Sequence, residues 1–290
     1  DTYQRSVGFT FKRNPNWHLG GGKRPYFDQV NVPIIPERAQ TEAQFRAKNL
    51  HAAAVSLQNI PVFFKELKGT KIVTATPIQN GALWGFSWAD NQPWKDVRIR
   101  RAMSMAVDRE GWGKTLQLDY KMESGPITWG YPNWKLDPAK IPADTQKWLK
   151  YDVAEAKKLL EAAGVSSSQT FTMHMYPYSP DYNAEAQFLI DGLKKIGMNV
   201  KLKVYDYNNW LATAYTGKYD DLLYGPDNLD RLTQQIADRY TAGSERNHSD
   251  VDDKDLTQMM KDFASAKSPA DAKTVLDKIQ VRAVDQMYTV

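Results

Sequence analysis

Helix-like and strand-like segments alternate at short intervals between residues 152 and 224, and this alternation constrains the fold more than any other feature. Asp152 and Glu155 are placed to start a helix in a capping-box arrangement, and Gly164 can supply the left-handed residue that ends it. The chain continues with a strand at 171–175, a helix that ends at 197, a strand at 200–204, a helix at 206–217 and a strand at 219–224. Strand, helix and strand with short joins predict a right-handed parallel crossover, and therefore an α/β fold with a partly parallel sheet.

The rest of the chain contains shorter predicted elements around one aperiodic stretch. Asp96 is placed as the N-cap of a helix whose apolar residues recur at helical spacing. Residues 119–150 are rich in Pro and Trp and show little periodicity, and loops of this length in compact domains are often functional. The remaining predictions are strands at 7–12, 30–35, 71–76 and 83–88, a helix at 41–55, and two amphipathic helices after 252 that Ser268 and Pro269 separate.

Length and charge limit the class of protein. A chain of 290 residues is long enough for two domains, and none of its stretches approaches the ~18 uninterrupted apolar residues of a membrane-spanning helix. The net charge of +4 comes from 38 basic and 34 acidic residues, and the densest basic group, residues 98–101, has acidic neighbours in sequence. A solvated helix face explains this group better than a phosphate-binding stripe, so we expect no nucleic-acid partner. The sequence has no Cys, which excludes disulfides and cysteine nucleophiles.

Motifs of catalysis and of cofactor binding are absent from the sequence. The four His residues are far apart and none has a HExxH-type spacing, so we predict no metal site. The sequence contains no GxSxG elbow and no GxGxxG or Walker-type phosphate loop, so we predict no cofactor and no catalysis. His174 falls on the polar face of a predicted strand, where a solvated or hydrogen-bonded imidazole is expected. A carbohydrate hydrolase is the alternative, because its two carboxylates need not be close in sequence.

Aromatic side chains are abundant, with nine Trp and fifteen Tyr. They combine apolar area with a polar group, which suits a ligand cleft, although a single Trp is more often a buried core ring. Tyr176 and Tyr178 follow the end of a predicted strand, which is where open α/β sheets bind ligands. Our other aromatic candidates for ligand contact are Trp88, Trp129, Tyr131, Trp134 and Trp210.

Several segments, in one order along nearly the whole chain, are similar to those of a known family. They are FKRNPNW at 11–17, WKDVRIRRAMSMAVDRE at 94–110, YDVAEAKKLLEAAG at 151–164, LKKIG at 193–197 and GKYD at 217–220. With these segments the chain resembles solute-binding protein family 5, which comprises the dipeptide, oligopeptide and nickel receptors of ABC importers.

The resemblance implies a two-lobed periplasmic-binding-protein fold of type II (cluster C-like) with an incomplete first lobe. Residues 1–80 are expected to form the C-terminal part of lobe I, and residues 81–290 most of lobe II, the ligand-binding lobe. The implied protein captures a small solute by closing about a hinge and delivers it to the membrane permease of an ABC importer. The implied location is periplasmic or extracellular, with the signal sequence or the lipid-anchored Cys in the missing first part.

The segment after residue 224 departs from the family pattern. In peptide receptors a Gly-Trp-x-x-Asp-Tyr segment supplies an Asp that pairs with the amino terminus of the peptide. Residues 225–231 here read GPDNLDR, so the Trp is missing and either Asp227 or Asp230 is the candidate for that role. This leaves two ligand classes open: an oligopeptide, the usual ligand of the family, and an oligosaccharide, whose rings stack well on aromatic side chains.

Overall fold

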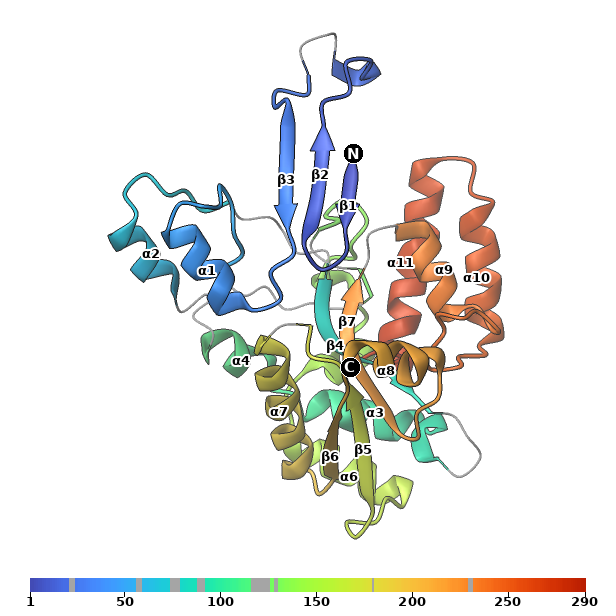
Figure 1. The fold of residues 1–290 in the computed structure, drawn as a ribbon. Coiled ribbons are helices and arrows are strands. Elements are labelled where there is room, and N and C mark those ends of the chain that lie inside the picture. The colour runs from blue at the N-terminus through green and yellow to red at the C-terminus, as the bar shows by residue number, and fades with distance from the viewer. Residues whose placement is uncertain are drawn as a thin grey trace. The chain divides into compact units, whose positions relative to one another are not determined.

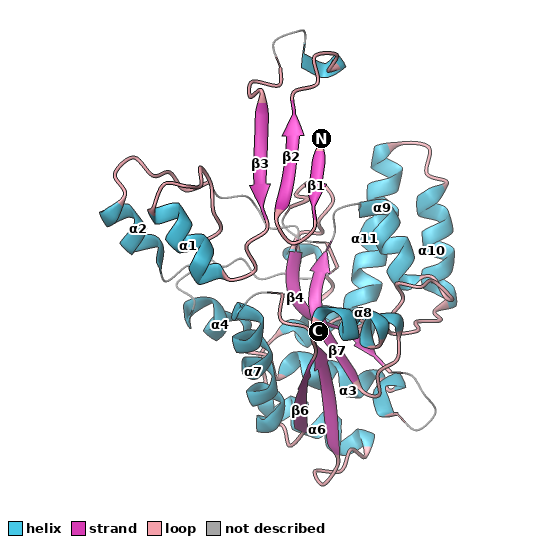
Figure 2. Ribbon diagram, viewed as in Figure 1, coloured by secondary structure: helices cyan, strands magenta, loops and turns pink. Residues whose placement is uncertain are grey.

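The structure is a computed structural model, and it describes residues 1–20, 24–55, 59–73, 79–87, 92–115, 126–127, 130–178, 180–228 and 232–290. The chain divides into two compact units, Asp1–Thr74 (unit 1) and Ala75–Val290 (unit 2). Figures 1 and 2 show the elements of each. The assignment of residues 1–80 to lobe I and 81–290 to lobe II stays a prediction.

Unit 1 contains a three-stranded antiparallel sheet in the order β1-β2-β3 and two helices. The elements are β1 (Thr2–Gln4), β2 (Gly8–Lys12), the short 3-10 helix His18–Gly20, β3 (Gln29–Pro33), α1 (Arg38–Arg46) and α2 (Ile60–Glu66). The predicted strands at 7–12 and 30–35 correspond to β2 and β3. The rings of Tyr3, Phe9 and Phe11 stack in a row along the sheet, with centroid distances of 4.7 and 6.0 Å, and all three residues are exposed.

Two predictions in unit 1 are wrong. The helix predicted at 41–55 ends at Arg46, because the chain turns at Lys48, which has a left-handed φ of 61°. Residues 71–73 of the strand predicted at 71–76 are not in a strand, and the rest of that segment lies outside the described residues. Periodicity did not predict the early end of this helix, because a single left-handed residue is sufficient to stop a helix.

Unit 2 contains a mixed four-stranded sheet in the order β4-β7-β5-β6. The strands are β4 (Gln79–Phe86), β5 (Thr170–Met175), β6 (Asn199–Val204) and β7 (Leu222–Asn228). β5 pairs in parallel with both β6 and β7, whereas β4 is antiparallel to β7. The parallel pairing of β5 and β6 across an intervening helix confirms the predicted crossover and the α/β class.

The helices of unit 2 begin largely where the sequence places side-chain caps. They are α3 (Val97–Met105), α4 (Arg109–Thr115), α5 (Ala143–Gln146), α6 (Val153–Ala163), α7 (Pro180–Lys195), α8 (Tyr207–Ala212), α9 (Leu232–Tyr240), α10 (Lys254–Ala264) and α11 (Pro269–Gln286). Short 3-10 helices lie at Pro93–Lys95, Pro138–Lys140, Lys147–Leu149 and Ala214–Thr216. The side chains of Asp96, Asp152 and Asp206 accept backbone N–H bonds at the starts of α3, α6 and α8, as N-caps do. Gly164 ends α6 with a φ of 74°, and Ser268 caps α11, so these predicted boundaries are confirmed.

The largest apolar core fills one face of the sheet, under α3, α6 and α7. Phe171, Met173 and Met175 of β5 point into it at the alternation of a strand, and Trp94 packs on Phe171 with a centroid distance of 4.8 Å. Arg100 is buried at the edge of this core and donates hydrogen bonds to the carbonyl oxygens of Trp94 and Gln286. These bonds tie α3 to the end of α11, because a buried guanidinium needs acceptors.

Two smaller cores complete unit 2. One is formed by α9, α10 and α11, with Ile236, Leu256 and Ile279 fully buried within it. The other lies on the opposite face of the sheet from the largest core and consists of Trp210, Ala214, Tyr219 and Leu223. Among the described residues, no helix combines the length and the apolar character needed to cross a membrane.

His248 lies beside the core of Trp210, and its environment makes stability depend on pH. Its ring is 5.0 Å from that of Tyr215, and its carbonyl oxygen accepts a hydrogen bond from the Tyr219 hydroxyl. Burial, together with the charges of Arg239 and Arg246, lowers the pKa of His248 from 6.5 to about 3. The unfolded chain therefore takes up a proton on this residue first as the pH falls below 6.5, which favours unfolding.

We expect the free energy of unfolding to fall by about 1.4 kcal/mol from His248 alone between pH 7.5 and pH 5.5. The stability that depends on the neutral His248 ring is fully present above pH 6.5. It is lost as the pH falls from 6.5 towards about 3, the pKa of His248 in the folded protein. Urea unfolding of the wild type and of His248→Gln at both pH values measures it, and the variant should lose less stability on acidification. Equal losses in the two proteins would show that the His248 ring is not buried in this way.

Candidate functional site

Tyrosines gather where the parallel strands of unit 2 end. Tyr176 directly follows β5 and Tyr205 directly follows β6, and the backbone N–H of Tyr205 donates to the carbonyl oxygen of Met175 at 2.9 Å. Tyr224 of β7 lies opposite Met175 in the sheet register. Because the carboxyl ends of parallel strands meet at one edge of a sheet, these three tyrosines lie at the edge where open α/β sheets bind ligands.

Five tyrosine rings form a continuous cluster at this edge. Tyr176 contacts Tyr178 edge-on at 4.7 Å and Tyr207 at 5.2 Å. Tyr182 lies 6.0 Å from Tyr178 and 6.1 Å from Tyr224. Such edge-to-face and tilted contacts stabilise aromatic pairs beyond their buried area, so each ring restrains its neighbours.

Part of the cluster is open to solvent. Tyr178 is 40% exposed, Tyr207 is 49% exposed and Tyr176 is half-buried, whereas Tyr182 and Tyr224 are buried. We call Tyr176, Tyr178 and Tyr207 the tyrosine face. It offers flat apolar rings and hydroxyl groups on a buried aromatic support, which is a combination that suits a ligand with both apolar and polar groups.

Local sequence explains why the tyrosine face forms. Tyr176 and Tyr178 flank a proline, and the N–H of Tyr178 donates to the carbonyl oxygen of Tyr176 at 3.1 Å, so the chain turns sharply before Pro180 begins α7. On the neighbouring strand, Asp206 caps α8, which places Tyr207 in its first turn. Two turns that follow adjacent strand ends therefore bring the exposed rings together.

Two hydroxyl groups of the cluster are held by fixed partners. Trp210 donates its indole N–H to the Tyr178 hydroxyl at 3.2 Å, and the Tyr224 hydroxyl donates to the Glu185 carboxylate at 2.7 Å. Burial raises the pKa of Tyr178, although the bond from Trp210 acts against this, and burial and then Glu185 raise the pKa of Tyr224. Both hydroxyls therefore stay protonated at physiological pH, and they can donate and accept hydrogen bonds.

Three of the predicted contact residues belong to this region. Tyr176 and Tyr178 follow the end of β5, as predicted, and form part of the tyrosine face, while their contact with a ligand stays a prediction. Trp210 lies directly behind Tyr178, but it is 0% exposed, so it supports the face and has no ring surface open to a ligand. The sequence does not distinguish a Trp in the core from a Trp that contacts a ligand, because tertiary packing decides between the two.

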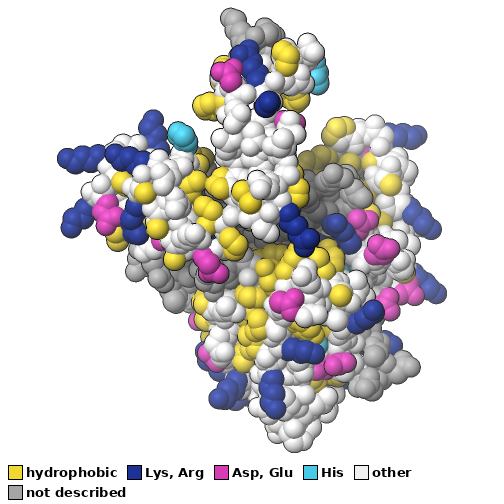
Figure 3. Space-filling view, in the orientation of Figure 1, with side chains coloured by type: hydrophobic (Ala, Val, Ile, Leu, Met, Phe, Trp, Pro, Cys, Tyr) yellow, Lys and Arg dark blue, Asp and Glu magenta, His cyan; other side chains and the backbone are white. Residues whose placement is uncertain are grey.

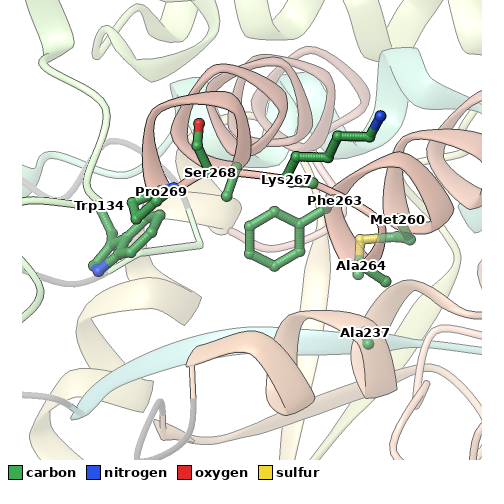
Figure 4. A pocket seen from close by; sticks show the side chains of 10 residues that line it. Trp134, Ala237, Met260, Phe263, Ala264, Lys267, Ser268 and Pro269 are labelled. Atoms are coloured by element: carbon green, nitrogen blue, oxygen red, sulfur yellow. The ribbon is translucent and has the colours of Figure 1, made fainter.

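Tyr131 and Trp134 belong to a different part of unit 2. Both pack against the core of α9, α10 and α11 and are half-buried. Trp134 also lines a cavity of about 470 Å³, and Figure 4 shows it there with Phe263 and Met260 of α10 and Pro269 of α11. The structure therefore brings Tyr131 and Trp134 together with each other and not into the tyrosine cluster.

Of the other predicted contact residues, the structure describes Asp227 alone. Trp88, Trp129 and Asp230 lie outside the described residues. Asp227 is in β7, where its backbone lies opposite Asn80 of β4. Their roles in ligand contact stay predictions.

Sequence reasoning missed three tyrosines of the cluster, Tyr182, Tyr207 and Tyr224, and also Glu185, which accepts the hydrogen bond from Tyr224. Two of them carried a usable signal, because Tyr224 ends a predicted strand and Tyr207 follows the cap of a predicted helix. Tyr182 and Glu185 are one and two turns into a helix that appeared only amphipathic. Within the described part of the chain, no three metal-ligating side chains lie close enough together to hold an ion.

The charged groups on the visible surface are mixed. The face drawn in Figure 3 carries Lys and Arg side chains interspersed with Asp and Glu. This face therefore carries no continuous stripe of charges of a single sign.

Comparison with known proteins places this chain in a family. Residues 1–247 match the model of "Bacterial extracellular solute-binding proteins, family 5 Middle". Di/tripeptide-binding protein 1 of Pseudomonas aeruginosa is 26% identical over 233 residues, which cover 77% of this chain and 40% of that protein. The chain thus spans less than half the length of this curated relative.

Solved structures with the same fold bind different ligands. The oligopeptide-binding protein AppA of Bacillus subtilis, in complex with a nonapeptide, matches with a TM-score of 0.80 at 20% identity, over 100% of this chain and 58% of that one. NikA of Staphylococcus aureus, in complex with Ni(L-His)2, matches with a TM-score of 0.77 at 13% identity, over 100% of this chain and 60% of that one. These relatives are binding proteins, and the match to the family model covers most of the residues described above. The chain belongs to the bacterial extracellular solute-binding proteins of family 5.

Proposed function

We propose that this protein is the substrate-binding subunit of an ABC importer and that it captures a peptide or another small polar solute outside the cytoplasmic membrane. The observation that carries the proposal is the tyrosine face at the carboxyl ends of β5 and β6. The rings supply apolar contact area, and the hydroxyls of Tyr176, Tyr178 and Tyr207 supply hydrogen bonds. Most curated relatives by name bind peptides, which favours a peptide as the ligand.

Capture in this proposal is a binding equilibrium without catalysis. A ligand that contacts both lobes of the whole protein favours the closed state by the difference between its contacts in the closed and open states. The permease of the importer then recognises the closed form. The protein acts in the periplasm or on the outside of the cell, and a lipid anchor on a longer form of the chain is compatible with that location.

A second ligand class is favoured by one specific observation. Tyr178 and Tyr207 expose flat ring surfaces, and sugar rings stack on such surfaces through their apolar faces. The segment at 225–228 also differs from the peptide-receptor pattern described above. An oligosaccharide is therefore the alternative ligand.

A thermal-shift screen of the protein as the cell makes it tests the proposal. The panel contains di- to pentapeptides, cello-oligosaccharides and manno-oligosaccharides. A ligand at a hundred times its Kd should add about 2.7 kcal/mol to the free energy of unfolding, because it binds only the folded state. We expect stabilisation by peptides; stabilisation by sugars alone would replace the peptide with the alternative ligand.

The control for this screen is Tyr151→Ala. Tyr151 is an exposed tyrosine of unit 2 outside the tyrosine face, and its hydroxyl accepts a hydrogen bond from Lys195 at 3.2 Å. This variant should keep the full ligand-dependent shift. No shift with any panel member, or turnover of one of them that depends on a single carboxylate, contradicts the proposed function.

A further inference from the structure

A buried histidine lies behind the tyrosine face. His174 of β5 is 2% exposed, and its side chain points to the face of the sheet opposite Met173 and Met175. Its Nδ1 lies 2.8 Å from the Tyr205 hydroxyl, and the two rings stack at 5.8 Å with an angle of 25°. The hydrogen bond and the stacking together fix the orientation of Tyr205.

A continuous series of contacts leads from His174 to the exposed ring of Tyr178. The ring of Tyr205 meets that of Trp210 edge-on at 6.1 Å. Trp210 is fully buried and donates its indole N–H to the Tyr178 hydroxyl. Each step is a directional contact between rigid rings, so a change in the position of Tyr205 alters the geometry available to Trp210 and then to Tyr178.

The groups around His174 favour the neutral imidazole. Lys203 lies opposite His174 in the register of β5 and β6, and its ammonium is 5.1 Å from the ring centroid of Tyr205. The ring of Tyr219 is 6.1 Å from that of His174, and Asp220 follows it in sequence. Burial and then Lys203 lower the pKa of His174, while Asp220 raises it. Within the described residues, the buried Nε2 has no hydrogen-bond partner, so a proton added to the ring gains no acceptor there.

Protonation also changes the bond to Tyr205. In the neutral ring Nδ1 can accept the proton of the Tyr205 hydroxyl, but in the imidazolium both ring nitrogens are donors. The hydroxyl must then rotate to accept, and the charge lies in an apolar site near a lysine. The same pair of residues therefore has one arrangement at neutral pH and a less favourable one in acid.

We propose that His174 is a positioning residue of the tyrosine face, which acts through Tyr205 and Trp210 to hold the hydroxyl of Tyr178 in place. The proposal rests on the proposed function for its effect on ligand affinity. Its structural part does not, because the Trp210 indole N–H reports on the series of contacts without any ligand. Failure of one part can thus be told from failure of the other.

The first measurement is hydrogen exchange of the Trp210 indole N–H by NMR, with the signal assigned from Trp210→Phe. Tyr205→Phe keeps the ring and removes the hydroxyl, and His174→Phe keeps a ring without polar atoms. Each should speed exchange about fivefold, the effect of losing a neutral hydrogen bond. Tyr151→Phe is the control, since Tyr151 is an exposed tyrosine elsewhere in unit 2 and its change should leave the rate within twofold.

The second measurement is the affinity for the tightest-binding member of the peptide panel between pH 7.5 and pH 5.0. Because the pKa of His174 is lowered from its ordinary 6.5, the wild type should keep its affinity at that pH and lose it only as the pH falls further. Tyr205→Phe should bind about fivefold more weakly at pH 7.5. His174→Asn keeps a polar atom near the position of Nδ1 and has no charge at any pH. At pH 7.5 it should therefore bind the peptide within twofold of the wild type, and its affinity should not change with pH.

The outcomes separate cleanly. Unchanged indole exchange in both Tyr205→Phe and His174→Phe overturns the proposal, as does a pH profile of His174→Asn identical to the wild type. If His174→Phe does not fold, Tyr205→Phe alone decides the first measurement. If no panel member binds but indole exchange responds as expected, the positioning role stands and the proposed function fails.

Discussion

Replacing Trp94 by alanine is expected to lower the free energy of unfolding by about 3–5 kcal/mol, the largest effect of any single change considered. Trp94 is 0% exposed and packs between Phe86, at 6.1 Å, and Phe171, at 4.8 Å. The change removes the whole indole ring from the core of unit 2, and the strand and helix around it cannot collapse fully into the space. The cost is therefore the transfer free energy of the ring plus the cavity.

The Trp94→Phe variant tests the cause of this loss. Within the described residues the indole nitrogen of Trp94 has no hydrogen-bond partner, so Phe loses only volume and keeps the contacts with Phe86 and Phe171. We expect a clearly smaller loss than for alanine, measured by urea unfolding at pH 7.5. If alanine and phenylalanine cost the same, or if alanine costs less than about 1 kcal/mol, Trp94 is not at the centre of a packed core.

The second large effect concerns the ligand. Tyr178→Ala is expected to weaken binding of the tightest panel peptide about 30-fold, which corresponds to about 2 kcal/mol, as for an aromatic residue at the centre of a contact surface. The variant removes an exposed ring, its contact with Tyr176 and the acceptor of the Trp210 indole. Isothermal titration calorimetry measures the Kd directly.

Two matched variants show which part of Tyr178 matters. Tyr178→Phe keeps the ring and loses only the hydroxyl, so we expect a loss of about fivefold. Tyr151→Ala removes a tyrosine of similar exposure elsewhere in unit 2 and should bind as the wild type does. Equal affinity of Tyr178→Ala and the wild type would exclude Tyr178 from the binding site.

Local signals in the sequence were sufficient for much of unit 2. Asp96 and Asp152 predicted helix starts, because a short polar side chain at an N-cap has few alternative uses. The alternation of apolar residues in β5 predicted which face meets the largest core. These features depend on near neighbours in sequence, which is why they could be predicted.

Features that depend on single backbone conformations or on distant neighbours were predicted less well. The early end of α1 depends on the left-handed φ of Lys48, a conformation that residue type does not require. The pairing of β4 with β7 joins segments that are more than a hundred residues apart, and no local pattern specifies it.

The candidate site was predicted in part for the same reasons. The positions of Tyr176 and Tyr178 could be predicted because a strand end predicts position in any open α/β sheet. Tyr207 and Tyr182 were missed because their contacts run between two turns and a helix from different parts of the chain. The burial of Trp210 follows from packing with Tyr205 and Tyr219, which periodicity alone does not show.

The account depends most on the position of the ligand in unit 2. The most direct test is an NMR titration of protein labelled with 13C in its tyrosine rings, with the tightest-binding panel member as ligand. We expect the largest shift changes, and ligand-to-ring nuclear Overhauser effects, at Tyr176, Tyr178 and Tyr207, with Tyr151 unchanged. Changes at other tyrosines, such as Tyr131 at the core of α9, α10 and α11, with these three rings unaffected, would contradict it.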